Sequence, residues 1–296
     1  MRYGAVETGG TKIVCAVIEE DGTIVERMQL PTGMPEETMK AVKEWFCGKE
    51  IAAFGVSTFG PVSLKKDSPM YGHILETTKE SWKYYDILAE LSTFGLPIGL
   101  DTDVNGACLG EIAFGAAKGL SDVLYLTVGT GIGAGIVLNG QPVHGMLHPE
   151  AGHVRLIRRA GDSRRSVCPY HECCAEGMAS GTAVKACYGV PASELSDNSD
   201  YLESEADYLA QALVNYILTV SPKKIIMGGG LMHEKALFPL IRRRVTELLG
   251  GYLVTDELKD MESYISPSGC LDNQGILGCL VLAKEALRKN ICADNE

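Results

Sequence analysis

Two cysteines and two histidines near the middle of the chain have the spacing of metal ligands. Cys168 and His171 form a C-x2-H pair, Cys174 follows three residues later, and His153 lies upstream. Thiolates and imidazoles select tetrahedral zinc, so this set predicts a closed structural zinc site. Cys173 is the alternative to Cys174 as fourth ligand, and surface cysteines beside a histidine are the alternative to a metal site.

Three glycine-rich turns have the composition of a nucleotide-binding site. They are Glu7-Thr8-Gly9-Gly10-Thr11-Lys12, the run from Gly129 to Gly135, and Gly228-Gly229-Gly230. Glycines let backbone N–H groups approach an anion, and hydroxyl and ammonium groups add donors. The Walker A pattern GxxxxGK[ST] is absent, and each turn alone is also consistent with a structural turn. Together, the first two turns predict binding of successive phosphates of one nucleotide. The third predicts a flat backbone surface against which the nucleotide lies.

A pair of carboxylates lies between the first two turns, in Asp101-Thr102-Asp103-Val104-Asn105. This segment follows a predicted strand, and the carboxyl ends of strands face the crevice of an α/β sheet. A carboxylate there is suited to accept a proton from an attacking hydroxyl. The alternative is that an Asp caps the helix that starts near Asn105.

The elements that position these residues alternate between strand and helix. Apolar alternation predicts strands over 3–7, 13–18 and 23–30, with a turn at Asp21-Gly22. Helical spacing begins at Pro35. The remaining predicted elements are strands over 51–57, 96–100, 123–128, 136–138 and 224–227, a loop over 60–80, and helices over 82–91, 208–220, 235–249 and 276–287.

The pattern of turn, strand and Asp/Asn-Gly turn occurs in both halves of the chain. This predicts an internal duplication, and chance recurrence in a chain with 34 glycines is the alternative. A length of 296 residues favours two α/β lobes with a ligand cleft between them. We expect an N-terminal lobe over 1–104, with a C-terminal helix at about 283–296 packing back on it, and a C-terminal lobe over 105–282 that carries the zinc-binding insertion.

Composition and charge exclude several classes of protein. The chain is 46% hydrophobic and 22% charged, which is globular rather than disordered. A formal charge of -11 and a pI near 5.1 disfavour nucleic acid and anionic membranes as partners. The sequence shows no signal peptide and no apolar run long enough to cross a bilayer, so we expect a cytoplasmic protein with reduced cysteines.

Taken together and in order, the motifs resemble those of the ROK (repressor, open reading frame, kinase) family of sugar kinases. They are ETGGTK, GVSTFGP, DTDVNGA, TVGTGIGAGIV, HPEAGH, CPYHECC with AEGMASG, and IIMGGG. The resemblance implies the two-lobed actin/hexokinase-like fold, which is a duplicated ribonuclease H-like fold. GVSTFGP and the C-x2-H-x2-C cluster look most like the bacterial fructokinase branch.

The resemblance also implies roles for individual residues. Asp103 would be the general base, and His153 would be both a sugar ligand and a zinc ligand. Sugar binding is implied for Gly60, Pro61, Thr102, Glu150, His153 and Glu176. ATP binding is implied for Gly9, Gly10, Thr11, Lys12, Gly129, Thr130, Gly131, Gly133, Gly228, Gly229 and Gly230. Mg²⁺ would accompany ATP, and the resemblance implies a homodimer.

Three positions depart from the family pattern. Glu7 stands where the superfamily often has Asp, Thr102 stands where glucose-directed members usually have Asn, and His171 replaces a cysteine ligand. The first phosphate turn begins at residue 7, so we expect the chain to lack the DNA-binding helix-turn-helix of the family's repressors.

The implied reaction is ATP-dependent phosphorylation of the primary hydroxyl of a hexose, fructose to fructose 6-phosphate. Glucokinase or N-acyl-hexosamine kinase activity is the alternative within the family. An ATPase or chaperone of the same superfold would not need Glu150, His153 and Glu176. A non-catalytic sugar sensor would not need Asp103.

Overall fold

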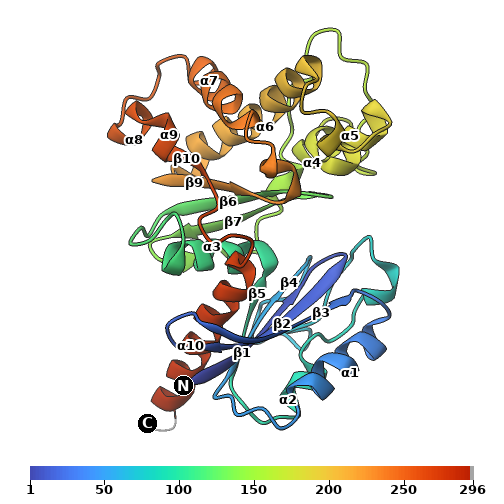
Figure 1. Ribbon diagram of the computed structural model, residues 1–296, viewed down its shortest axis with the longest axis vertical. Helices are drawn as coiled ribbons and strands as arrows, with labels where there is room; N and C mark the ends of the chain where they lie inside the picture. Colours follow the sequence, from blue (N-terminus) through green and yellow to red (C-terminus); the bar gives the residue numbers. More distant parts are fainter. Residues whose placement is uncertain (294–296) are drawn as a thin grey trace. The chain divides into compact units, whose positions relative to one another are not determined.

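The computed structural model describes residues 1–293, which form two units, each built on a five-stranded sheet (Figure 1). The first unit comprises residues 1–119, 143–148 and 269–296, and the second comprises 120–142 and 149–268. The prediction put the boundary at 104/105, whereas the first division falls at 119/120.

The sheet of the first unit has the order β3-β2-β1-β4-β5. Its strands are β1 (Arg2–Thr8), β2 (Lys12–Glu19), β3 (Ile24–Pro31), β4 (Phe54–Thr58) and β5 (Ile98–Thr102). β1 pairs antiparallel with β2 and parallel with β4, which in turn pairs parallel with β5. The carboxyl ends of β1, β4 and β5 therefore meet at one edge of this sheet.

Helices cover both faces of this first sheet. They are α1 (Pro35–Phe46), η1 (Glu80–Trp82), α2 (Ala89–Ser92), α3 (Asp103–Phe114) and α10 (Gln274–Ala293). Because strand side chains alternate between faces, Val6 packs in the cluster that holds Met39 of α1, while Ala5 packs in the cluster that holds Ile276 of α10.

Helix α10 packs against its neighbours in the first unit with backbone close to backbone. A Cβ on Gly55 of β4 would lie 1.7 Å from the Cys279 carbonyl oxygen, and one on Gly278 would lie 1.7 Å from that of Gly106. Glu111 of α3 accepts hydrogen bonds from the N–H groups of Gly269 and Cys270. These contacts explain why α3 and the whole of α10 fall in the first unit and not on the far side of a boundary at residue 104. The predicted helix over 283–296 is part of α10, and its residues 294–296 lie outside the described residues.

The sheet of the second unit has the order β10-β9-β6-β7-β8. Its strands are β6 (Val123–Val128), β7 (Ile132–Leu138), β8 (Gln141–Pro142), β9 (Lys224–Gly228) and β10 (Ile265–Pro267). β6 pairs antiparallel with β7 and parallel with β9, as β1 pairs with β2 and β4. Read from the other edge, the order repeats that of the first sheet, which confirms the predicted duplicated α/β fold.

The long helices α6 (Ser199–Val220) and α7 (Leu237–Leu249) pack side by side on one face of the second sheet (Figure 1). The shorter helices of this unit are η2 (Ala151–His153), α4 (Ala175–Ala179), α5 (Gly181–Tyr188), η3 (Ala192–Glu194), η4 (Gly230–His233), α8 (Asp256–Lys259) and α9 (Met261–Tyr264). Within residues 1–293, no helix is long and apolar enough to span a membrane.

The predicted helix over 82–91 is wrong, because only η1 and α2 form there. Trp82 is buried and its Nε1–H donates to the Gly33 carbonyl oxygen, while Tyr84 has a φ of 60° that interrupts any helix. A further difference concerns a helix end: α6 begins at Ser199 instead of residue 208, because the Asn198 side chain caps it by accepting the N–H of Tyr201.

Candidate functional site

Asp103, the predicted base, lies at the first position of α3, directly after β5. Thr102 is the N-cap, and its Oγ1 accepts the N–H of Asn105 at 3.2 Å. The role of helix cap therefore falls to Thr102 and not to an Asp, which removes the structural explanation offered for Asp103. The Asp103 Oδ1 atom accepts the N–H of Val104 at 2.9 Å, and the residue is half-buried.

Asp101 holds the same turn in place through hydrogen bonds. It is 3% exposed, and its Oδ1 accepts the Thr102 N–H at 2.8 Å and the Asn105 Nδ2–H at 2.7 Å. A third partner is His144, whose Nε2 lies 3.2 Å from Asp101 Oδ1 and 3.1 Å from Oδ2. From the sequence, Asp101 is one of two carboxylates suited to accept a proton, and no role is predicted for His144.

His144 belongs to the segment 143–148, which joins the first unit although the chain on both sides of it belongs to the second. A second histidine fixes the other end of this segment, because His148 Nε2 accepts the N–H of Val62 at 3.1 Å. Val62 follows Gly60 and Pro61, which are joined by a cis peptide bond. The segment therefore lies against the loop that carries two of the predicted sugar-binding residues.

The first glycine turn is the hairpin loop between β1 and β2. The Gly9 N–H donates to the Lys12 carbonyl oxygen at 2.9 Å, and the Thr32 hydroxyl donates to the Gly9 carbonyl oxygen at 2.8 Å. Gly10, Thr11 and Lys12 are exposed. These bonds fix the loop while leaving its tip accessible to a ligand.

The second glycine turn joins β6 to β7 and is held by α5. The Gly129 carbonyl oxygen accepts the Gly181 N–H at 2.7 Å, and the Thr130 carbonyl oxygen accepts the Thr182 hydroxyl at 2.7 Å. Thr130 is exposed, and Gly131 and Gly133 are partly exposed. The equivalent connection in the first sheet is the Gly9–Lys12 turn, so the duplication places a glycine turn at the same point of each sheet.

The third glycine run, Gly228 to Gly230, spans the end of β9 and the start of η4, and a side chain would not fit at its first two positions. A Cβ on Gly228 would lie 2.2 Å from the Tyr125 hydroxyl oxygen. Gly229 has a φ of 90°, in the left-handed region, and a Cβ there would lie 2.5 Å from the Val128 carbonyl oxygen.

Glu150, His153 and Glu176 gather in the second unit. His153 Nε2 lies 3.9 Å from Glu176 Oε1. Partial desolvation raises the pKa of Glu150, with the Glu176 carboxylate adding to the rise and His153 opposing it. The three side chains thus offer hydrogen-bond acceptors and an imidazole of the kind that sugar hydroxyls bind. The other predicted sugar residues, Gly60, Pro61 and Thr102, belong to the first unit.

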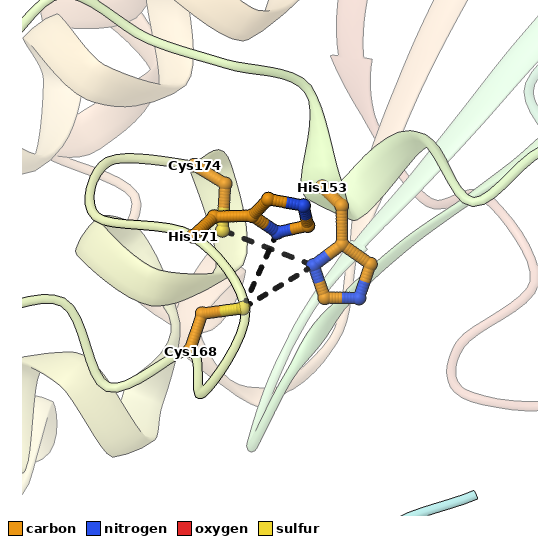
Figure 2. Close-up of side chains that lie close together, drawn as sticks. All are labelled: His153, Cys168, His171 and Cys174. Atoms are coloured by element: carbon orange, nitrogen blue, oxygen red, sulfur yellow. Dashed lines mark hydrogen bonds between the residues drawn. The ribbon is translucent and has the colours of Figure 1, made fainter. Parts of the chain in front are cut away.

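The four predicted metal ligands converge (Figure 2): one ligand atom from each of His153, Cys168, His171 and Cys174 lies within 4.8 Å of every other. Cys168 Sγ is 3.7 Å from His153 Nδ1 and 3.4 Å from His171 Nδ1, and Cys174 Sγ is 3.8 Å from His153 Nδ1. Tetrahedral zinc, with Zn–S of about 2.3 Å and Zn–N of about 2.0 Å, separates sulfur from nitrogen by roughly 3.5 Å. The donor set and its spacing therefore fit zinc.

Cys173 and Cys174 take different places. Cys174 is fully buried and belongs to the group of four, while its Sγ also accepts the Gly177 N–H that caps α4. Cys173 is outside this group, and its carbonyl oxygen accepts the Leu156 N–H in a strand-like contact. The geometry favours Cys174 over Cys173 as the fourth ligand.

The chain is similar along its length to known proteins. The family model described as "ROK family" matches residues 3–286. A protein of Bacillus subtilis is 46% identical over 287 residues, covering 96% of each chain. The fructokinase of Pediococcus pentosaceus is 41% identical, covering 97% of this chain and 99% of its own, and that of Zymomonas mobilis is 38% identical, covering 97% and 98%.

Solved structures share the fold. A ROK hexokinase from Thermus thermophilus has a TM-score of 0.74 at 24% identity, covering 98% of this chain and all of its own. A ROK family glucokinase from Streptomyces griseus, in complex with glucose and AMPPNP, has a TM-score of 0.75 at 23% identity, covering 96% of this chain and all of its own. At these identities the likeness establishes the fold.

Proposed function

Because the chain belongs to the ROK family, we propose that it is an ATP-dependent kinase that converts fructose to fructose 6-phosphate. The observation that carries the proposal is its similarity, over 97% of its length, to the fructokinases of P. pentosaceus and Z. mobilis. The site geometry supports the same reading, because acceptors for sugar hydroxyls, glycine turns and a carboxylate at a strand end are all present.

Asp103 is the proposed general base. Phosphoryl transfer asks little covalent chemistry of a protein and depends on in-line positioning and charge neutralisation. Asp103 accepts the proton of the sugar's primary hydroxyl as the hydroxyl oxygen attacks the γ-phosphorus of ATP. The bond between the γ-phosphorus and the β,γ-bridging oxygen breaks, and ADP leaves with the bridging oxygen. Because Thr102 and not Asp103 caps α3, the Asp103 carboxylate takes up the proton without loss of the helix cap.

The glycine turns are proposed to bind ATP. The accessible backbone at Gly10 and Thr11, with the Lys12 ammonium, suits one set of phosphate oxygens, and the turn from Gly129 to Gly133 suits another. Gly228, Gly229 and Gly230 would border the adenosine, since the absence of side chains lets a flat base approach the backbone. Mg²⁺, when bound with ATP, neutralises charge on the phosphates.

The zinc site is proposed to be structural. His153, Cys168, His171 and Cys174 would hold the ion, which supplies a fixed cross-link and no open coordination position. His153 then has two partners, since its Nδ1 faces the sulfurs and its Nε2 faces Glu176. This division of the two ring nitrogens would fix the orientation of the sugar-binding carboxylate.

The proposal is tested by a coupled ADP-release assay with ATP and Mg²⁺ on fructose, glucose, mannose and N-acetylmannosamine. We expect fructose to give the highest kcat/KM. Preference for glucose or an N-acyl-hexosamine would retain the kinase and reassign its sugar, whereas sugar-independent ADP release would contradict the kinase. We also propose a homodimer, which light scattering of the purified protein checks.

A further inference from the structure

The buried carboxylate of Asp101 pairs with the partly exposed imidazole of His144 beside the proposed base. The Asp101 side chain is 4% exposed, and the His144 side chain is 41% exposed. Nε2 of His144 lies 3.1 and 3.2 Å from the two carboxylate oxygens, so the imidazole faces the middle of the carboxylate. Forty-three residues separate the two in sequence, and the contact joins the segment 143–148 to β5.

The carboxylate of Asp101 has further donors on either side of Asp103. It accepts the backbone N–H of Thr102, which precedes Asp103, and the side-chain amide of Asn105, which follows it on α3. Asn105 Nδ2 also lies 3.5 Å from His144 Nε2. The backbone and side-chain groups that flank Asp103 are therefore oriented by one carboxylate, and protonated His144 balances the charge of that carboxylate.

We propose that the Asp101–His144 ion pair positions Asp103 for proton abstraction, with His144 acting as a positioning residue whose charge controls the rate. The proposal rests on the proposed kinase function. If His144 loses its proton, Asp101 keeps two neutral donors but loses its only cationic partner among the described residues. The turn that carries Asp103 would then relax, and a misplacement of about 1 Å at a reacting group can cost roughly a hundredfold in rate.

Other titratable groups lie near the pair in the sequence or in space. Asp101 comes from β5, Asp103 from the start of α3, and Tyr71, whose pKa is raised by burial and by the Asp101 charge, from the loop after β4. The hydrogen bond to Asp101 raises the pKa of His144, against an opposing effect of partial burial. The protonated imidazolium therefore persists at pH values above the ordinary histidine pKa of about 6.5, and it is lost as pH rises through the raised pKa.

The first test is a pH profile of kcat and of KM for fructose on the full chain, with fructose varied at saturating ATP. Wild type should lose kcat as pH rises through the pKa of His144. His144→Gln, which keeps a neutral donor, should show a kcat lower by about tenfold at pH 6, little change in KM, and no alkaline decline from this group. His73→Gln is the matched control, because among residues 1–293 the hydrogen bond of its ring is to the Tyr71 carbonyl oxygen and not to Asp101, and it should keep the wild-type profile.

A second measurement separates this proposal from the kinase assignment. Titration of the His144 ring by NMR, without sugar or ATP, should give a pKa above 6.5 that falls in Asp101→Asn. An unchanged pKa in that variant, or a His144→Gln profile identical to wild type, would overturn the positioning role. If the pair titrates as expected but no sugar is phosphorylated, the proposed kinase fails and the positioning role fails with it, while the ion pair stands.

Discussion

Glu176 Oε2 accepts the backbone N–H of Ile132 at 3.0 Å. The bond ties α4, which follows the metal-site residues, to the glycine turn between β6 and β7. The other carboxylate oxygen of Glu176 faces His153. One side chain thus connects the proposed zinc site, the proposed sugar site and a proposed phosphate turn. The fit is close, because a Cβ on Gly131 would lie 2.6 Å from Glu176 Oε2.

Replacing Glu176 should affect sugar binding more than stability of the fold. We expect Glu176→Ala to lower kcat/KM for fructose by about tenfold to a hundredfold, since hydrogen bonds to charged groups contribute about 1.5–3 kcal/mol. Glu176→Gln should lose less, because its amide oxygen can still accept the Ile132 N–H. Glu172→Gln, an exposed carboxylate on the neighbouring loop, is the control. Equal kinetics for all three variants would contradict the assignment.

Asp103→Asn should remove the base without disturbing α3, because Thr102 caps the helix. We expect kcat to fall by at least about a hundredfold, the usual scale for a lost general base, with KM for ATP and the melting temperature nearly unchanged. Steady-state kinetics and thermal unfolding measure these quantities. Turnover close to that of wild type would show that another group takes the proton.

The metal site makes a prediction about composition. Elemental analysis should find about one zinc per chain, and Cys168→Ser should remove it and lower the melting temperature. Cys173→Ser is the matched control and should retain zinc, because Cys173 lies outside the cluster. Loss of zinc in Cys173→Ser alone would reassign the fourth ligand, and a fully active preparation without metal would rule out the site.

Fructose should be preferred over glucose by roughly tenfold to a hundredfold in kcat/KM. The physical reason is that an unpaired buried hydroxyl costs about 1–3 kcal/mol, and Thr102 offers fewer hydrogen-bonding groups than the Asn usual in glucose-directed relatives. Thr102→Asn should narrow the gap, and α3 should stay capped because Asn is also a good N-cap. A wild-type kcat/KM for glucose equal to that for fructose would defeat the substrate assignment.

We expect the free energy of unfolding to depend on pH because of the buried carboxyl group of Glu205. It is fully buried on α6, and neither carboxylate oxygen has a hydrogen-bond partner among the described residues. Burial raises its pKa well above the ordinary value, against a smaller effect of Arg164. The folded state therefore holds a proton that the unfolded state releases above about pH 4.3, so stability falls as pH rises from there toward the raised pKa.

Glu205→Gln should remove this dependence, which for one proton is at most about 1.4 kcal/mol per pH unit. Denaturant unfolding at pH 6, 7 and 8 should show the variant gaining on wild type as pH increases. Parallel curves for the two proteins would mean that Glu205 is ionised in the folded state.

Much of the fold was predictable because its signals are local. The Asp21-Gly22 turn and the glycine turns mark the hairpins β1–β2–β3 and β6–β7, and the repeated pattern indicates the duplication. The metal cluster was predictable for the same reason, since Cys168, His171 and Cys174 lie in one short loop and their side chains need little help to converge.

What was missed depends on contacts between distant residues. Trp82 is drawn into the core beside Phe59, and this tertiary contact overrides the helical pattern around it. The pairing of Asp101 with His144 leaves no periodic trace, because it depends on how the segment 143–148 docks. The short strands β8 and β10 have too few residues to show alternation.

The interleaving of the two units in the sequence has a consequence for modular engineering. The first unit is assembled from 1–119, 143–148 and 269–296, so no single continuous gene fragment encodes it. The second unit is interrupted by 143–148, whose two histidines bind partners in the first. Exchange of either unit between homologues therefore requires several coordinated junctions, and a crossover placed within 120–143 would take His144 and His148 from a different parent than Asp101 and Val62.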